Sequence, residues 1–129
     1  MAVFRKLLKN RKGDIIIPVV DKLRWVPDYS KASSTNLWSS STSTTITESG
    51  FVTTRVCYYK INANCELYIY INGLEVSYCA GEARGPNNAV VSSVSGVFPV
   101  SVGDIVSYGY TSGASANSKM CKFIPGKWA

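Results

Sequence analysis

The stretch that decides the fold is Cys65-Glu-Leu-Tyr-Ile-Tyr-Ile-Asn-Gly-Leu-Glu-Val-Ser-Tyr78. Its first half alternates apolar side chains with polar or aromatic ones, which is the period-two pattern of a strand with one buried face. Asn72-Gly73 then supplies the two residues of positive φ that a type I′ turn requires. The alternation continues after the turn, and the sequence therefore predicts an antiparallel hairpin with a two-residue loop.

A two-residue loop fixes how the two strands face each other, and it sorts the facing residues into two sets of pairs. The predicted pairs on the apolar side are Ile71 with Leu74, Ile69 with Val76, and Leu67 with Tyr78. The predicted pairs on the other side are Tyr70 with Glu75, Tyr68 with Ser77, and Glu66 with Cys79. One side of the hairpin is continuously apolar, which predicts an antiparallel β domain that buries it.

Strand patterns of the same kind recur along the chain, with turn residues between them. From residue 44 onward they are 44–47, 51–61, 66–72, 74–78, 89–94, 96–100, 105–110 and 119–124. Short strands with no helix between them are typical of a β-sandwich. A chain of 129 residues is long enough for one domain with a real core. We therefore predict an all-β fold, an antiparallel, jelly-roll-like β-sandwich with a short basic N-terminal extension.

The sequence before residue 44 differs from the rest in composition. Residues 1–31 carry eight Lys or Arg and three Asp, a net charge of +5, whereas residues 32–129 have a net charge of +1. These differences predict three parts of the chain. They are an attachment segment at 1–20, a Ser/Thr-rich linker or edge structure at 21–43, and the β-sandwich domain at 44–129.

The basic cluster within the first twelve residues is a candidate contact for other molecules, and a strand-like piece at 14–20 follows it. Such a cluster suits an acidic protein surface, phosphate or an anionic membrane surface. A solvated tail, docking onto another protein and nucleic-acid binding all stay open. Specific nucleic-acid recognition is not expected, because the β domain lacks a basic stripe interleaved with aromatic residues. Membrane insertion is not expected either, because the longest apolar run, at 15–20, is too short to cross a bilayer.

Few residues in the chain suit catalysis or metal binding. The chain has no histidine, its carboxylates form no close pair, and its four cysteines include no Cys-x-x-Cys motif. We therefore expect no enzyme activity, no cofactor and no metal site. Cys57, Cys65, Cys79 and Cys121 are expected to be free and mostly buried thiols, with Cys65 and Cys79 on opposite faces of the predicted hairpin. Asp104 is expected to cap the turn that contains it.

Tyrosines in the predicted strands are a better guide to function. Rings exposed on a sheet pack against another subunit or stack on a ligand such as a sugar, unless a second sheet covers them. The candidate subunit-contact residues are Tyr58, Tyr68, Tyr70 and Tyr108. The polar loop at 80–89 is either a natural place for specificity on a rigid scaffold or a solvated connector. Its candidate ligand-binding residues are Glu82, Arg84, Asn87 and Asn88.

Several motifs, taken in their order along the chain, resemble bacteriophage fibre tip domains. They are Gly50-Phe-Val52, Leu67-Tyr-Ile-Tyr-Ile-Asn-Gly73, Phe98-Pro-Val-Ser-Val-Gly-Asp-Ile-Val106 and Phe123-Ile-Pro-Gly-Lys-Trp128, preceded by Leu8-Lys-Asn-Arg-Lys-Gly-Asp-Ile-Ile-Ile-Pro-Val19. The resemblance covers roughly residues 8–129 and consists of turns and strand ends. It implies a trimeric jelly roll at a virion surface, related in shape to C1q and tumour-necrosis-factor heads. The chain lacks a long shaft, which favours a short fibre, a head fibre or a compact receptor-binding tip.

The function implied by this resemblance is adhesion to the host-cell surface by a homotrimer on a virion, assembled in the host cytoplasm. The expected partners are further copies of the chain, other virion proteins and a host glycan or protein. The candidate virion-attachment residues are Phe4, Arg5, Leu7, Leu8, Ile15 and Ile17. Two alternatives stay open: a capsid decoration or cement protein without a ligand, and a C1q-like binding module of bacterial or prophage origin.

Overall fold

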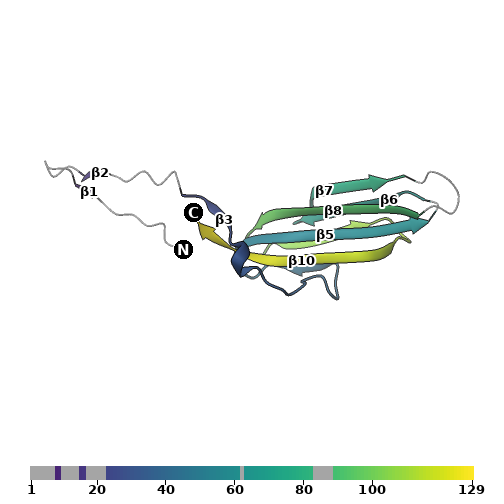
Figure 1. Ribbon diagram of the computed structural model, residues 1–129, viewed down its shortest axis with the longest axis horizontal. Helices are drawn as coiled ribbons and strands as arrows, with labels where there is room; N and C mark the ends of the chain where they lie inside the picture. The colour runs from purple at the N-terminus through teal and green to yellow at the C-terminus, as the bar shows by residue number, and fades with distance from the viewer. Residues whose placement is uncertain (1–7, 10–14, 17–22, 62, 83–88) are drawn as a thin grey trace.

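Two four-stranded antiparallel sheets face each other in the computed structural model, which describes residues 8–9, 15–16, 23–61, 63–82 and 89–129 (Figure 1). The β5 sheet consists, in spatial order, of β3 (Trp25–Pro27), β10 (Ser115–Trp128), β5 (Gly50–Ile61) and β8 (Ala89–Val100). The β6 sheet consists of β4 (Ser43–Thr45), β9 (Ile105–Tyr110), β6 (Cys65–Ile71) and β7 (Leu74–Gly81). The remaining elements are a 3-10 turn, η1 (Tyr29–Lys31), and the paired two-residue strands β1 (Leu8–Lys9) and β2 (Ile15–Ile16).

The strand order identifies the topology. The pairs are nested as in one long hairpin that has been rolled up: β3 lies beside β10, β4 beside β9, β5 beside β8, and β6 beside β7. Alternate pairs of this series belong to different sheets, which is the arrangement of a jelly roll. The predicted all-β antiparallel sandwich is confirmed. The stretches predicted as separate strands at 89–94 and 96–100 are one continuous strand, β8.

The hairpin that decides the fold forms with the predicted turn but with a shifted register. Asn72 and Gly73 have φ values of 53° and 78°, as the type I′ turn requires. The first two pairs beyond the turn, Ile71 with Leu74 and Tyr70 with Glu75, are those predicted. Beyond them Val76 is an extra residue in β7 and makes a β-bulge, because Ile69 pairs with Ser77.

Beyond the bulge, the predicted pairs between β6 and β7 are wrong. Tyr68 pairs with Tyr78 instead of Ser77, and Leu67 pairs with Cys79 instead of Tyr78. Because side chains alternate across a strand, one extra residue exchanges the inner and outer sets beyond it. Tyr78 therefore stands on the outer face, where it is 50% exposed. Cys79 shares the inner side with Cys65, so the expectation of opposite faces for these two thiols was wrong.

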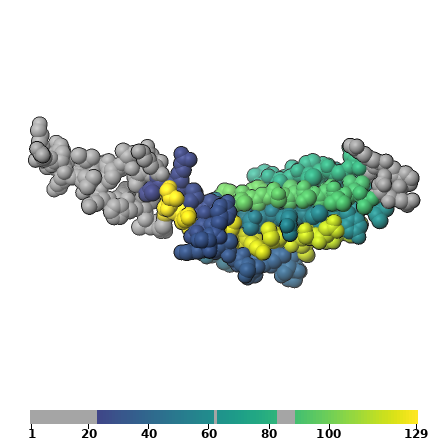
Figure 2. Space-filling view, viewed as in Figure 1, coloured from purple at the N-terminus to yellow at the C-terminus, as the bar shows by residue number. Residues whose placement is uncertain are grey.

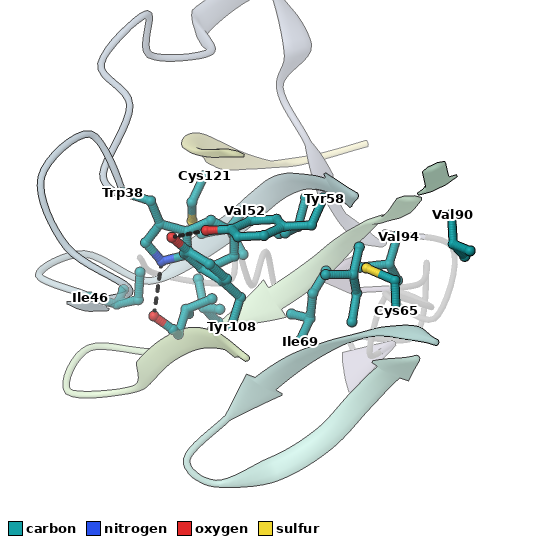
Figure 3. Close-up of a cluster of buried hydrophobic side chains, with 14 residues drawn as sticks. Trp38, Ile46, Val52, Tyr58, Cys65, Ile69, Val90, Val94, Tyr108 and Cys121 are labelled. Carbon is teal, nitrogen blue, oxygen red and sulfur yellow. Dashed lines mark hydrogen bonds between the residues drawn. The ribbon is translucent and has the colours of Figure 1, made fainter. Parts of the chain in front are cut away.

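The segment predicted as a linker or edge structure at 21–43 belongs to the domain. Its strand β3 pairs with the end of β10, and the side chain of Trp38 is completely buried. The indole Nε1 of Trp38 donates a hydrogen bond to the Val106 carbonyl oxygen, 3.2 Å away (Figure 3). Asn36 caps the free edge of β10, because its amide accepts from the Cys121 N–H and donates to the Lys119 carbonyl. The sandwich therefore starts well before residue 44.

The core lies between the sheets and includes two of the predicted subunit-contact residues. Tyr58 and Tyr108 are only 4% and 5% exposed, and their hydroxyl oxygens lie 3.3 Å apart (Figure 3). The Tyr108 ring also packs on Trp38, with ring centroids 4.8 Å apart. These two rings lie inside the sandwich and not on a surface that a second copy reaches. Strand alternation explains this correction, since β5 turns Tyr58 inward together with Val56.

One end of the sandwich holds both limits of the described domain and the hairpin turn. Arg24 and Ala129 exchange two backbone hydrogen bonds of 2.8 and 2.9 Å. At the same end Asp104 accepts from the Ser101 N–H at 2.8 Å and from the Asn72 amide at 2.9 Å, which confirms the predicted cap and lowers the pKa of Asp104. β7 ends and β8 begins at the opposite end (Figure 1).

Most of the predicted attachment residues lie outside the described residues: Phe4, Arg5, Leu7 and Ile17. The backbones of Leu8 and Ile15 belong to the short β1–β2 ladder. Of the strand-like piece at 14–20, the structure describes only the two residues of β2. Among the described residues there is no helix long and apolar enough to span a membrane.

Candidate functional site

The outer side of β6 and β7 carries a group of aromatic side chains around one carboxylate. We name this group the tyrosine face and define it as Glu66, Tyr68, Tyr70 and Tyr78. Strand alternation turns Leu67 and Ile69 of β6 into the core and thereby turns the residues between them outward. The bulge in β7 adds Tyr78 to the same side, directly opposite Tyr68.

The three rings of the tyrosine face form one contiguous aromatic surface. The ring centroids of Tyr68 and Tyr70 are 5.9 Å apart with an angle of 16° between the ring planes. The centroids of Tyr68 and Tyr78 are 5.2 Å apart at 39°. Both separations lie in the range in which aromatic pairs attract each other. Tyr68 therefore joins its neighbours along and across the strands.

The Glu66 carboxylate accepts hydrogen bonds from two of the three tyrosine hydroxyl groups. The Tyr68 hydroxyl donates to Oε2 of Glu66, and the Tyr78 hydroxyl donates to Oε1 at 3.4 Å. The hydrogen bond to this carboxylate raises the pKa of Tyr68 to about 12, and partial burial together with the same carboxylate raises the pKa of Tyr78. Both hydroxyls are thus protonated donors at neutral pH. The residue opposite Glu66 is Ala80, whose small side chain leaves room for both contacts.

Glycine on the neighbouring strand allows the rings to lie close to the sheet. Gly109 of β9 faces Tyr68, and a Cβ at this position would lie 3.2 Å from Cε2 of Tyr70 and 3.7 Å from Cδ2 of Tyr68. The two rings therefore cover the backbone at Gly109. Any larger side chain there would have to displace the Tyr70 ring.

The two sheets carry charges of opposite sign. Within the bounds of the four strands of the β6 sheet, the charged residues are Glu66 and Glu75, and no Lys or Arg occurs. Within the strands of the β5 sheet, the charged residues are Arg55, Lys60, Lys119, Lys122 and Lys127, and no Asp or Glu occurs. The tyrosine face thus lies on the acidic sheet of a basic protein.

A second aromatic surface lies at the end where β3 meets β10. The ring centroids of Trp25 and Trp128 are 5.3 Å apart at an angle of 58°. The Trp25 ring occupies the space above Gly126, where a Cβ would lie 2.0 Å from the ring. Together with Glu48 and Ser49 the two indoles line a shallow depression. Its position beside Arg24 and Ala129 places it at the base of the domain and away from the β7–β8 end.

The structure brings together some of the predicted site residues. Tyr68 and Tyr70 stand on the outer face, where they are available for contact, and Glu82 is exposed just beyond the end of β7. The other predicted ligand-binding residues, Arg84, Asn87 and Asn88, lie outside the described residues. Sequence reasoning missed Tyr78, because the bulge that turns it outward has no glycine or proline to mark it.

The thiols and acidic groups form no constellation for metal binding in the described part of the chain. No group of three or more Cys, Asp or Glu residues comes together there. All four cysteines are free thiols, two of them buried (Cys65 and Cys121) and two half-buried (Cys57 and Cys79). Burial raises the pKa of the Cys121 thiol to about 12, so it is protonated at neutral pH.

Comparison with known proteins found no matching family model and no matching curated protein. Among solved structures, the chain is similar to the structure of Eiger TNF from S. frugiperda, with 11% sequence identity and a TM-score of 0.49. The match covers 63% of this chain and 62% of that one. The assignment of the jelly roll rests on the strand order of the two sheets.

Proposed function

We propose that the protein is a non-catalytic adhesion domain, displayed as a homotrimer on a phage particle, that holds a host-cell glycan on the tyrosine face. The observation that carries the proposal is the contiguous outer surface of Tyr68, Tyr70 and Tyr78 around Glu66. Sugars stack their C–H faces on aromatic rings, and their hydroxyl groups bond to carboxylates and phenols. This face offers both kinds of contact side by side.

A single site of this kind is shallow, and its affinity is correspondingly weak. We expect a dissociation constant on the order of 1 mM for one sugar, which is about −4 kcal/mol. Three such faces in one trimer, repeated on a particle, would raise the apparent affinity without any new contact. Weak sites and high valency are therefore compatible with firm attachment.

The outer side of β8 supports the trimer part of the proposal. Its outward residues are exposed and uncharged, and they include Val91 at 56% and Val97 at 44% exposure. β8 is the edge strand of its sheet and lies beside β5, which separates it from β10 on the same face of the domain (Figure 2). Exposed uncharged strands of this kind tend to be covered by another chain. Assigning the subunit contact to β8 leaves Tyr68 and Tyr70 free for a ligand.

The virion part of the proposal rests on the resemblance of the sequence motifs to fibre tip domains and on the placement of the chain. Arg24, where the described domain begins, lies at the end opposite to the junction of β7 and β8. Attachment through the residues before Arg24 would therefore present the β7–β8 end outward. The tyrosine face runs along the side of the domain between these two ends.

The experiment uses full-length protein on particles and two kinds of variant. Tyr70→Ala should reduce attachment of particles to host cells without changing the trimer mass measured by light scattering. The control Tyr29→Ala changes a tyrosine that is 65% exposed on η1, and it should attach like the wild type. Normal attachment of Tyr70→Ala would refute adhesion through this face and favour a decoration protein without a ligand.

The assembly is tested separately. Val97→Lys places a charge on the exposed side of β8 and should convert the trimer to a monomer at micromolar concentration. Glu75→Lys, which changes another exposed residue, on β7, should leave the trimer intact. A trimer that survives Val97→Lys but is lost in Tyr70→Ala would move the subunit contact to the tyrosine face.

A further inference from the structure

We propose that the tyrosine face selects glycans with free amino groups, so that its preferred ligand is a hexosamine unit in its ammonium form. This inference rests on the proposed function, because it names the ligand class of the same face. It is carried by the combination of three aromatic rings with a carboxylate on a sheet whose strands contain no basic residue.

The aromatic rings and the carboxylate recognise an ammonium group by different interactions. At an exposed site the negative faces of the rings strengthen the binding of a cation about two- to fivefold. An exposed ion pair with a carboxylate strengthens it further, by a factor of up to about five. A neutral hydroxyl at the same place gains neither of these terms. Together they predict binding about tenfold tighter for an amino sugar than for a matched neutral sugar.

Glu66 is positioned for this contact before any ligand arrives. The Tyr68 and Tyr78 hydroxyls each donate to a different oxygen of the carboxylate, which restricts its orientation. An ionised carboxylate has about four acceptor sites, so two remain for an incoming group. An ammonium group has three donors and no acceptor, and it can bond to the carboxylate while it lies beside the Tyr68 ring.

The negative charge around the tyrosine face disfavours acidic glycans. Glu75 pairs with Tyr70 across the hairpin, and Glu82 is exposed just beyond the end of β7. These carboxylates have the same sign as Glu66, and a uronic or sialic acid would meet repulsion from all three. The five basic residues in the strands of the β5 sheet lie on the other layer of the sandwich.

The test is a titration of the full-length trimer with three oligosaccharides of equal length: a glucosamine oligomer, its N-acetylated form and a galacturonic acid oligomer. The titrations are run at a pH at which the amino groups are protonated, and binding is followed by calorimetry. We expect the glucosamine oligomer to bind about tenfold more tightly than the N-acetylated one. The acidic oligomer should give no measurable binding. The tenfold preference should shrink as salt is raised, because the ionic contact is exposed to solvent.

Glu66→Gln is the decisive variant, because it keeps the shape and one acceptor but removes the charge. It should reduce the preference for the amino sugar to about two- to fivefold, the part left to the rings. Glu48→Gln is the matched control, since it removes one carboxylate beside the exposed Trp25 and Trp128 rings. This variant should keep the full preference. Loss of the preference in Glu48→Gln, with retention in Glu66→Gln, would overturn the assignment to the tyrosine face.

Other outcomes separate this inference from the proposed function. Equal binding of the amino and N-acetylated oligomers would overturn the ammonium preference, yet glycan adhesion would stand. Absence of binding to all three would also overturn the inference, and if Tyr70→Ala still blocked particle attachment, the host ligand would be a protein. Normal attachment of Tyr70→Ala particles would refute the proposed function itself.

Discussion

The β5 sheet and the β6 sheet build one core but present different surfaces. Both contribute buried side chains to a single cluster, for example Val52 and Val56 from β5 and Leu67 and Ile69 from β6. Outside that cluster the β5 sheet is basic, with small uncharged side chains along β8, whereas the β6 sheet is acidic and aromatic. Alternation along each strand makes this separation possible, because inner and outer positions can change independently. One framework can thus combine an assembly surface with a recognition surface.

The largest effect should come from Trp38, a buried side chain of the core between the two sheets. Trp38→Ala removes a completely buried indole that packs on Tyr108 and donates to the Val106 carbonyl. We expect a loss of about 3–5 kcal/mol in the free energy of unfolding. Urea unfolding, followed by circular dichroism, measures it. Trp128→Ala, on an exposed indole pair, should cost only about 1 kcal/mol. Similar losses for both variants would show that the buried indole of Trp38 contributes no more to stability than an exposed one.

The next effect concerns a polar contact between the sheets. Tyr58 of β5 and Tyr108 of β9 share a hydrogen bond in the core, and burial raises the pKa of Tyr58. Each single change to Phe should cost about 1–3 kcal/mol, because it leaves the other hydroxyl buried without its partner. The double variant Tyr58→Phe/Tyr108→Phe should cost less than the sum of the single changes. Strict additivity in a denaturant-based double-mutant cycle would mean that the two hydroxyls do not interact.

A smaller, pH-dependent effect on stability is expected at the end of the β6 sheet where Asp104 contacts the Asn72-Gly73 turn. The Asn72 amide donates to Asp104, whose pKa is lowered mainly by the Ser101 N–H and next by this amide. A lowered pKa means that the contact stabilises the fold above the unfolded pKa of about 4 and is lost as the pH falls. Asn72→Asp replaces the donor with a second carboxylate. The variant should melt at a lower temperature than the wild type at pH 7, and the difference should shrink toward pH 3.

The reciprocal variant provides the control for this contact between Asn72 and Asp104. In Asn72→Asp/Asp104→Asn the amide and the carboxylate exchange places, so one donor again faces one carboxylate. Thermal melting at pH 7 should therefore recover most of the loss seen in Asn72→Asp. Failure to recover would indicate that backbone geometry at the turn, rather than this pair, determines its stability.

The smallest expected effect is a difference in labelling rate between buried and half-buried thiols, which occur in both sheets. Each sheet contains one buried thiol and one half-buried thiol: Cys121 and Cys57 on the β5 sheet, and Cys65 and Cys79 on the β6 sheet. Burial raises the pKa of Cys65 and of Cys121 and so suppresses their thiolate forms. A disulfide reagent at pH 8 should label Cys57 and Cys79 first. Peptide mapping that finds Cys121 labelled as fast as Cys57 would contradict this.

Local patterns in the sequence predicted the parts of the fold that depend on neighbouring residues. The Asn72-Gly73 turn, the strands around it and the cap at Asp104 all depend on contacts close in sequence or on a turn with a known signature. The inward position of Tyr58 also follows from alternation with Val56, but an outward aromatic pattern on the hairpin suggested a shared surface. Alternation within β5 was the better guide for this residue.

The parts that sequence reasoning missed depend on long-range packing. Trp38 lies in a run of serines and threonines with no strand period, and only its contacts with β9 and its burial in the core cluster reveal it as a core residue. The bulge at Val76 is likewise unmarked, since no residue type there demands it. Three of the four residues of the tyrosine face could be predicted from the alternation in β6 alone, whereas the outward position of Tyr78 could not. The residue pairs next to the Asn72-Gly73 turn are determined by the turn and were predictable. The pairs beyond Val76 depend on packing within the whole sheet and were not.

The bulge at Val76 also makes the register of β7 a determinant of surface chemistry. If Val76 paired with Ile69 in an unbroken ladder, Tyr78 would face Leu67 in the interior and Cys79 would lie opposite Glu66 on the outer side. Deletion of Val76 would instead leave a regular ladder with the observed pairs, Tyr68 with Tyr78 and Leu67 with Cys79. One unpaired residue thus determines which row of β7 side chains reaches the outer surface, while the Asn72-Gly73 turn and the opposite sheet stay as they are.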